Sequence, residues 1–185
     1  EELYPQFKDK IKVFTLPSLF DFDSIDRLAD EPNEMDKSAK CIVSVGRLVE
    51  LKGFHLCIEP CKQLVDEGYN IKWYICGEGP QRESLEELIK QYGMEKHFIL
   101  LGNKSNPYTY INSADICVQP SSYEGLGLVV YEEKYLKKPV ICSRIGSFLE
   151  MISDNENGLI VTRNKESIYN AVKQLLDNPE MMTQL

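Results

Sequence analysis

The sequence predicts an α/β fold, a Rossmann-like parallel sheet with helices on both faces, and three observations support this prediction. From residue 41 onward, short apolar runs of strand length alternate with segments of helical periodicity. Several of the short runs, such as Cys41–Val45, are almost continuously apolar, which is typical of parallel strands that are covered on both sides. Glycine-bearing turns follow most of these runs. Strands that alternate with helices form parallel sheets through right-handed crossovers.

The first 40 residues differ from the rest of the chain. Residues 11–16 read as a strand that Pro17 ends, whereas residues 21–40 are acidic and polar, and residues 30–36 are the best candidate for a linker. We therefore expect residues 1–40 to be an interdomain segment and residues 41–185 to form one domain. Because the first residue is Glu1 and not Met, we expect the chain to be a piece of a longer protein.

Six apolar runs after residue 40 predict the strands of the sheet. Each is five or six residues long and bounded by glycine, proline or polar residues, as expected for strands and not for helices. The predicted strands are residues 41–45, 71–76, 97–101, 115–119, 139–143 and 158–162.

The helices are predicted in the intervals between these strands. One covers about residues 54–67, and the next begins with Pro80 at its first position, where a missing N–H costs nothing. The remaining helices are a short one at about 106–113, one that starts near Gly127, a short one around Glu150, and a last one at 165–176. With strands on either side, these helices are expected to cover both faces of the sheet.

Composition and charge limit the possible functions. A chain of 185 residues can form one substantial core but not two large domains. The net charge of −8 argues against a general nucleic-acid binder, so an anionic ligand would have to be bound by local positive groups. No apolar run approaches the ~20 residues of a membrane span, and the start shows no signal-peptide pattern. We therefore expect a cytoplasmic protein.

The cysteines are expected to be packing residues. Four of the six lie in or beside strand-like runs, where thiols pack as small hydrophobic groups, and Cys57 and Cys61 share one face of a predicted helix. The sequence contains only two histidines, so no combination of residues indicates a metal site.

Charged and glycine residues gather directly after the predicted strands. In an open parallel sheet all of these positions lie at the carboxyl edge, where such folds bind ligands. A single glycine has a structural explanation, because turns need its conformational freedom, but the combination indicates a site. The positions are Arg47, Lys52, residues 77–79, Gly102–Lys104, Glu124–Gly127 and residues 144–146.

The turn between residues 121 and 132 is the strongest candidate. The backbone N–H groups of Gly125–Leu128 have no partner within the following helix and, with the positive end of the helix dipole, can receive a phosphate or a sugar. Glu132 shares an apolar stripe with Leu128 and Leu136, and its oxygens could accept hydrogen bonds from a vicinal diol such as that of ribose. An alternative is that Glu124 is only a helix N-terminal carboxylate and Glu132 a surface residue.

Taken in order along the chain, these motifs carry a family resemblance. The motifs are Gly46-Arg47 with Lys52-Gly53, Gly77-Glu78-Gly79-Pro80, Pro120-Ser121 before Glu124-Gly125-Leu126-Gly127 and Glu132, Lys138-Pro139-Val140, and Asn157-Gly158-Leu159. Over residues 41–185 the series resembles the donor-binding, C-terminal domain of retaining GT-B glycosyltransferases of family 4 (glycosyl transferases group 1). The resemblance implies that the domain is one half of a GT-B fold.

The resemblance implies a role for each candidate residue. Arg47 and Lys52 would bind the donor's diphosphate and stabilise its charge during catalysis, and Glu124 would contact the transferred sugar as the third catalytic residue. Glu132 would bind the ribose. Backbone groups at Gly102, Asn103 and Lys104 would receive the nucleobase. The turn that holds phosphate and sugar would consist of Gly125, Leu126, Gly127, Leu128 and Val129.

The resemblance also implies a reaction and its partners. A hexosyl unit would pass from a UDP- or GDP-linked donor, with retention of configuration, to a glycan or lipid-linked acceptor in polysaccharide or cell-surface biosynthesis. No cofactor and no divalent metal would be required. The N-terminal domain would bind the acceptor, so this chain alone should be inactive. The full-length enzyme could associate peripherally with the inner face of the membrane.

The chain departs from the family pattern at two places, and two other functions remain as alternatives. Glu133, Lys134 and Tyr135 follow the second glutamate, where the family has small residues, and Gly146-Ser147 replaces its usual Gly-Gly. The alternatives are a sugar-nucleotide epimerase or phosphorylase-like enzyme of the same architecture, and a non-catalytic nucleotide-binding module. A Rossmann dehydrogenase fits less well because no Gly-x-Gly-x-x-Gly follows the first strand.

Overall fold

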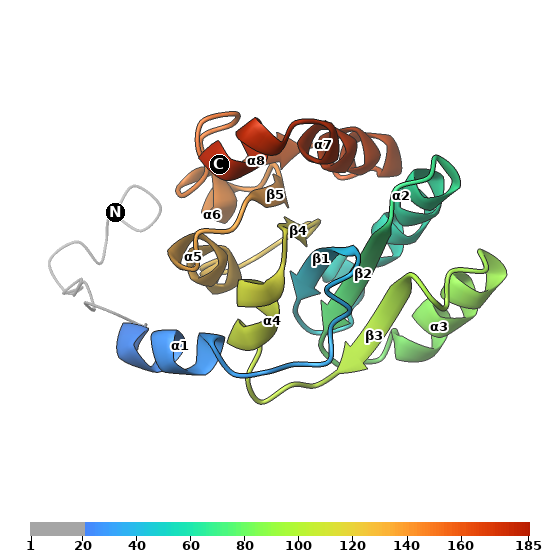
Figure 1. Cartoon of the computed structure of the whole chain (residues 1–185), viewed down its shortest axis with the longest axis horizontal. Helices are drawn as coiled ribbons and strands as arrows, with labels where there is room; N and C mark the ends of the chain where they lie inside the picture. Colours follow the sequence, from blue (N-terminus) through green and yellow to red (C-terminus); the bar gives the residue numbers. More distant parts are fainter. Residues whose placement is uncertain (1–20) are drawn as a thin grey trace, which may run out of the picture.

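The computed structural model describes residues 21–185, and these form an α/β domain around one parallel sheet (Figure 1). The six strands of this region run in the order β3-β2-β1-β4-β5-β6, and all neighbouring strands pair in parallel. The predicted fold class is therefore confirmed. The predicted strand at 11–16 lies outside the described residues.

The strands match the apolar runs of the sequence to within about one residue at each end. At the centre of the sheet, Ile42 of β1 lies opposite Trp73 of β2 and Ile116 of β4. These three side chains are fully buried, as expected for a parallel sheet covered on both faces. The strands are β1 (Lys40–Val45), β2 (Ile71–Cys76), β3 (Phe98–Gly102), β4 (Ile116–Gln119), β5 (Val140–Ser143) and β6 (Leu159–Val161).

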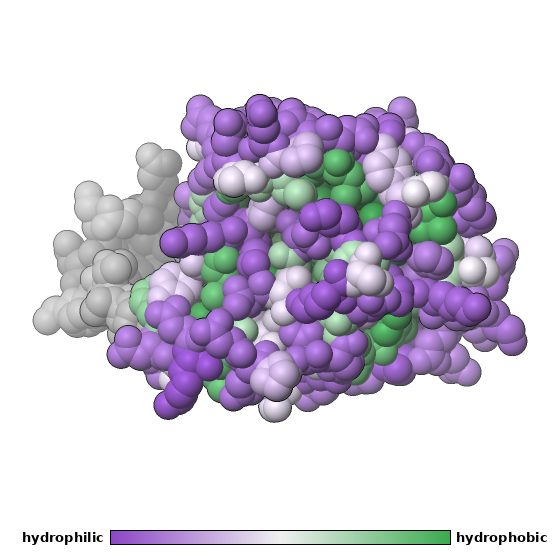
Figure 2. Space-filling model, viewed as in Figure 1, coloured by the Kyte–Doolittle hydropathy of each residue, from purple (hydrophilic) through white to green (hydrophobic). Residues whose placement is uncertain are grey.

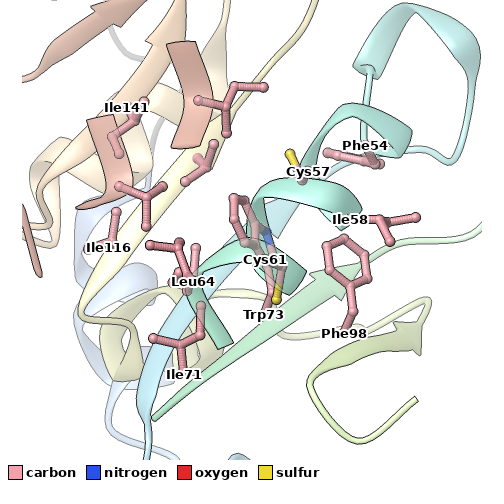
Figure 3. Close-up of a cluster of buried hydrophobic side chains, with 14 of the residues drawn as sticks. Phe54, Cys57, Ile58, Cys61, Leu64, Ile71, Trp73, Phe98, Ile116 and Ile141 are labelled. Carbon is pink, nitrogen blue, oxygen red and sulfur yellow. The ribbon is translucent and has the colours of Figure 1, made fainter. Parts of the chain in front are cut away.

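Three long helices cover one face of the sheet, which we call the long-helix face. They are α2 (His55–Asp66), α3 (Arg82–Gln91) and α7 (Lys165–Asp177). Figure 3 shows the core beneath them, where Leu64 and Cys61 of α2 point toward Trp73. The Trp73 ring stacks on Phe98 with centroids 5.8 Å apart, and its N–H donates to Ser44. All six cysteines are buried and free, which confirms that they pack as small hydrophobic groups.

Shorter helices cover the opposite face, which we call the short-helix face (Figure 1). They are α4 (Tyr108–Ser113), α5 (Leu128–Tyr135) and α6 (Gly146–Leu149). Their buried side chains, among them Ile111, Val130 and Phe148, form a second apolar cluster on this side of the sheet. A further helix, α1 (Phe22–Ala29), packs on α4 at the outside of this layer.

Three elements were absent from the sequence prediction. These are α1, a single 3₁₀ turn at Glu50–Lys52, and the C-terminal α8 (Pro179–Gln184). One predicted position was wrong. The helix expected to begin at Pro80 begins at Arg82, because Pro80 belongs to the preceding turn. The short helix expected around Glu150 is α6, which has Glu150 as its C-cap.

The acidic segment before β1 packs against the domain. Met35 is buried in the apolar cluster of the short-helix face, and the Asn33 amide donates to the Thr109 carbonyl of α4. The division of the chain at residue 40 stays a prediction.

Hydrophilic residues cover most of the face seen in Figure 2. None of the helices within residues 21–185 has both the length and the apolar composition to cross a membrane.

Candidate functional site

The predicted site residues lie where the direction of the sheet changes. In the strand order, β1 and β4 are neighbours, and the chain winds outward from them to opposite edges of the sheet. The loops after two such strands separate and leave a crevice, which is where open α/β sheets bind ligands. Arg47 and Lys52 follow β1, and Glu124 follows β4. The fold therefore brings residues more than 70 positions apart to the same crevice.

Lys52 and Glu124 meet in this crevice as an ion pair. Lys52 Nζ lies 2.5 Å from Glu124 Oε1, and the two side chains are only 18% and 15% exposed. The Ser121 hydroxyl donates to the same carboxylate oxygen at 2.8 Å. The lysine side chain passes directly over Gly46, where a Cβ would lie 2.9 Å from Lys52 Cε. Gly46 thus leaves the space in which Lys52 reaches the carboxylate.

The two loops that carry this pair are in close contact. The Ser122 N–H donates to the Leu51 carbonyl at 2.7 Å. Gly53 has φ +71°, and a Cβ at this position would lie 2.5 Å from the Pro120 carbonyl oxygen. Because other residues rarely adopt this φ and none would fit against the carbonyl, glycine is required for the approach of the loops.

The turn before α5 has the conformation that its glycines suggest. Gly127 adopts φ +65° and precedes the first helical residue, Leu128, so the predicted start of this helix is confirmed. A Cβ on Gly127 would lie 2.9 Å from a Met151 side-chain atom. Gly125 is exposed, and the side chains of Tyr123 and Leu126 are 68% and 61% exposed. The predicted binding turn is therefore open to solvent next to the Lys52–Glu124 pair.

A pocket of about 400 Å³ lies at the ends of β1, β2 and β3. Arg47, Asn103 and Lys104 are among its lining residues, so two of the predicted binding segments face a common space. The third member of the predicted nucleobase segment, Gly102, is not among the lining residues of this pocket. Its carbonyl accepts the Gly77 N–H at 2.9 Å, which joins the two turns at this edge.

A carboxylate from the segment before β1 reaches Lys104. Glu34 Oε1 lies 2.5 Å from Lys104 Nζ, and the Tyr110 hydroxyl donates to Glu34 Oε2 at 2.5 Å. The hydrogen bonds from Lys104 and Tyr110 lower the pKa of Glu34 to about 2 and keep it ionised. The sequence prediction did not include Glu34, because no local pattern shows that this segment folds back beside residue 104.

Helix α5 presents two adjacent glutamates in different environments. Glu132, the predicted ribose ligand, is partly buried, and its Oε1 accepts from the Tyr108 hydroxyl at 3.2 Å. Burial raises its pKa, and the Tyr108 hydrogen bond partly offsets this. The predicted stripe of Leu128, Glu132 and Leu136 is not the most buried face of the helix. That face contains Val130 and Glu133, both fully buried.

Glu133 is a second carboxylate near the site that the sequence prediction did not include. Its Oε1 accepts from Gln119 Nε2 of β4 at 2.5 Å, whereas its Oε2 and the Gln119 oxygen have no partner within the described residues. Burial raises the pKa of Glu133 to about 8, which favours its neutral form at physiological pH. A signal was present in the sequence, because the family pattern has small residues where this chain has Glu133.

Within residues 21–185, no group of three or more histidine, cysteine, aspartate or glutamate residues is arranged to hold a metal ion. Two cations, Arg47 and Lys104, line the pocket at the ends of β1, β2 and β3, and a third, Lys52, pairs with Glu124 in the crevice between the loops after β1 and β4. Cations at the carboxyl edge of a doubly wound sheet can bind an anionic ligand.

The family follows from comparison with known proteins. The family model described as "Glycosyl transferases group 1" matches residues 26–185, and the chain belongs to this family. It is 31% identical over 144 residues to an alpha-D-kanosaminyltransferase of Streptomyces kanamyceticus, a match that covers 76% of this chain and 37% of that protein. It is 26% identical over 172 residues to the poly(ribitol-phosphate) alpha-N-acetylglucosaminyltransferase of Staphylococcus aureus, covering 92% of this chain. The chain spans only 35% of that second relative.

Solved structures give the same result. A mutant of S. aureus TarM, solved with Fondaparinux, alpha-GlcNAc-glycerol and UDP, matches with a TM-score of 0.74 and 26% identity over 84% of this chain and 32% of that one. The C-terminal domain of the group 1 glycosyl transferase LpcC from Francisella tularensis matches with a TM-score of 0.71 and 26% identity. That match covers 78% of this chain and 79% of the LpcC domain. The predicted glycosyltransferase family is therefore confirmed.

Proposed function

We propose that this chain is the donor-binding half of a retaining GT-B glycosyltransferase of family 4. The enzyme transfers a hexosyl unit from a nucleotide sugar to a glycan or glycolipid acceptor in polysaccharide or cell-surface biosynthesis. The observation that carries the proposal is the Lys52–Glu124 pair, a cation and a carboxylate held 2.5 Å apart at the switch point of the sheet. Relatives named for transfer of amino sugars and for lipopolysaccharide and capsule biosynthesis support the proposed reaction class.

In this proposal the diphosphate lies between Arg47, Lys52 and the turn before α5. Negative charge builds up on the departing nucleoside diphosphate during transfer, and cations already in place stabilise it most effectively. Before the donor binds, Lys52 is neutralised by Glu124. When the diphosphate takes over Lys52, the Glu124 carboxylate is released to contact the hydroxyl groups of the transferred sugar. These cations supply the charge stabilisation, so transfer proceeds without a divalent metal.

The nucleoside occupies the pocket beside Arg47. Asn103 and Lys104 line this pocket and present groups for the base, which we expect to be uracil or guanine. Glu132 binds the ribose diol. Its partial burial and its hydrogen bond from Tyr108 fix the direction of the carboxylate, and a diol can donate to both of its oxygens.

The acceptor is bound by the other half of the enzyme, at the inner face of the membrane. The chain covers 35% to 42% of the length of eight glycosyltransferases that it is similar to. Transfer needs acceptor groups placed against the donor in a water-free cleft. The chain alone should therefore bind the donor and transfer nothing.

Calorimetric titration against UDP-, GDP- and ADP-sugars and the free nucleotides tests this function. We expect one class of nucleotide sugar to bind with one-to-one stoichiometry and the others to bind weakly. A non-catalytic nucleotide-binding module would bind the free nucleotide as tightly as its sugar derivative. With the matched donor and crude acceptor membranes, only the full-length protein should turn over; equal turnover by this chain would refute its role as a donor-binding half.

A further inference from the structure

A residue from a third part of the chain bridges the two loops of the candidate site. Arg163 donates from Nε to the Pro120 carbonyl oxygen at 3.1 Å and from Nη2 to the Glu50 carbonyl oxygen at 2.9 Å. Pro120 begins the loop that carries Glu124, and Glu50 begins the 3₁₀ turn that carries Lys52. One guanidinium therefore joins the backbones that lead to both members of the ion pair.

The backbone of Arg163 is fixed on both sides. It lies between the edge strand β6 and Asn164, the N-cap of α7, whose side chain accepts from the Ser167 N–H at 2.8 Å. The Ser167 hydroxyl in turn accepts from the Thr162 N–H at 3.1 Å. Because these bonds anchor both neighbours of Arg163, the side chain extends from a rigid base toward the loops after β1 and β4.

The chemistry of the bridge requires a guanidinium group. Among residues 21–185, Arg163 forms no ion pair with a carboxylate, and its described hydrogen bonds go to the two carbonyl groups. A planar group with donors in fixed directions can hold two carbonyls at once, whereas a lysine ammonium is a single point charge. Gly53 leaves room for the group, since a Cβ there would lie 3.1 Å from Arg163 Nη2.

We propose that Arg163 is a positioning residue of the donor site, which holds the loops after β1 and β4 in register so that Lys52 and Glu124 meet. Its effect on binding rests on the proposed function, whereas its effect on the loops does not. Arg163 touches neither the ion pair nor the pocket, so its removal acts through the backbone. A shift of about 1 Å in a positioned group can cost about 100-fold in rate or binding.

Two readouts on Arg163→Ala and Arg163→Lys test the proposal. The first is amide hydrogen exchange without nucleotide at Ser122 and Gly53, whose N–H groups bond the carbonyls of Leu51 and Glu50. We expect faster exchange at both amides in both variants. The second is calorimetric titration with UDP and with GDP, for which we expect about 10- to 100-fold weaker binding in both variants. Arg27→Ala removes the same charge from α1 and should change neither readout.

Chemical rescue separates bridging from attraction by charge. Millimolar guanidinium, which can donate to both carbonyl groups, should restore binding to Arg163→Ala, whereas millimolar methylammonium, which carries the same charge, should not. Unchanged exchange at Ser122 and Gly53, or full binding by Arg163→Lys, would overturn the proposal. The two readouts can also disagree. If exchange is faster in the variants but the wild-type chain binds neither UDP nor GDP, the result supports the bridge and contradicts the proposed function.

Discussion

The two faces of the sheet are built in different ways. On the long-helix face, α2, α3 and α7 are 12, 10 and 13 residues long and bury an apolar cluster around Trp73. On the short-helix face, α4, α5 and α6 have 6, 8 and 4 residues and bury Thr109 and Glu133 beside apolar side chains. The candidate ribose ligand Glu132 and the turn before α5 belong to this second face.

This difference indicates that the two faces contribute differently to stability and to local geometry. Long amphipathic helices over an apolar face supply most of the burial that stabilises a domain. Buried polar groups contribute little net stability but fix one geometry when they are paired. We infer that the long-helix face supplies most of the stability of the domain, whereas the polar groups of the short-helix face fix local geometry, such as the direction of Glu132 through the Tyr108 hydroxyl. The predictions below test this division, in order of decreasing effect.

The largest effect should come from the core of the long-helix face. Leu64→Ala removes a fully buried side chain from α2 and should lower the free energy of unfolding by about 2–5 kcal/mol. Urea denaturation measures this loss. As a control, Leu149→Ala on α6, where the side chain is 44% exposed, should change stability by less than about 0.5 kcal/mol. A similar loss in both variants would contradict the division.

Glu133 should make stability depend on pH. Its folded-state pKa is about 8 against an ordinary value of 4.5, so the folded chain holds a proton that the unfolded chain releases. Stability from this group is complete below pH 4.5 and is lost as the pH rises toward 8. Glu133→Gln should remove this decline in the free energy of unfolding, which is a few kcal/mol at most. The contributions of the other titratable groups should be the same in both proteins. Parallel curves for both proteins would show that Glu133 is ionised when folded.

Removing either diphosphate cation should weaken binding without loss of the fold. Arg47→Ala and Lys52→Ala should each cost about 1–3 kcal/mol of nucleoside-diphosphate affinity, as expected for charge-assisted hydrogen bonds. Both side chains lie outside the apolar clusters, so thermal stability should stay close to that of the wild type. Loss of folding together with binding would assign the Lys52–Glu124 pair a structural role.

The smallest effect should separate ribose from phosphate recognition. Glu132→Gln should cost about 1.5 kcal/mol for ligands that contain ribose, because the charged acceptor of the diol becomes neutral. Inorganic pyrophosphate, which has no diol, should bind as before. Equal losses for UDP and pyrophosphate would show that Glu132 acts on the turn before α5 and not on the ribose.

How well the sequence predicted each part depends on whether its signals are local in the sequence. The strands and the helices α2 and α7 were predicted closely, because apolar runs and helical periodicity are local signals. Glu34, Glu133 and Arg163 were not predicted as parts of the site, since their roles depend on contacts with residues 104, 119 and 120. Helix α1 was missed because its short, acidic sequence forms a helix through an Asp21 cap and packing on α4.

The positions of the site residues were predictable for a topological reason. Each follows a parallel strand, so all had to lie at one edge of the sheet, and the strand order then placed Lys52 beside Glu124. The partners of these residues could not be predicted, because a sequence gives the order of the turns but not the register of side chains across a crevice.

The most direct test of the donor-site assignment is a titration of the Arg47→Ala/Lys52→Ala double variant. The ligand is the nucleoside diphosphate that binds the wild type most tightly, and the control is Lys62→Ala/Lys90→Ala, which removes two lysines from the outer surfaces of α2 and α3. The account predicts a loss of about 30-fold or more in affinity for the first variant, the sum of the two single losses, and none for the second. Full affinity in the Arg47→Ala/Lys52→Ala chain would contradict it.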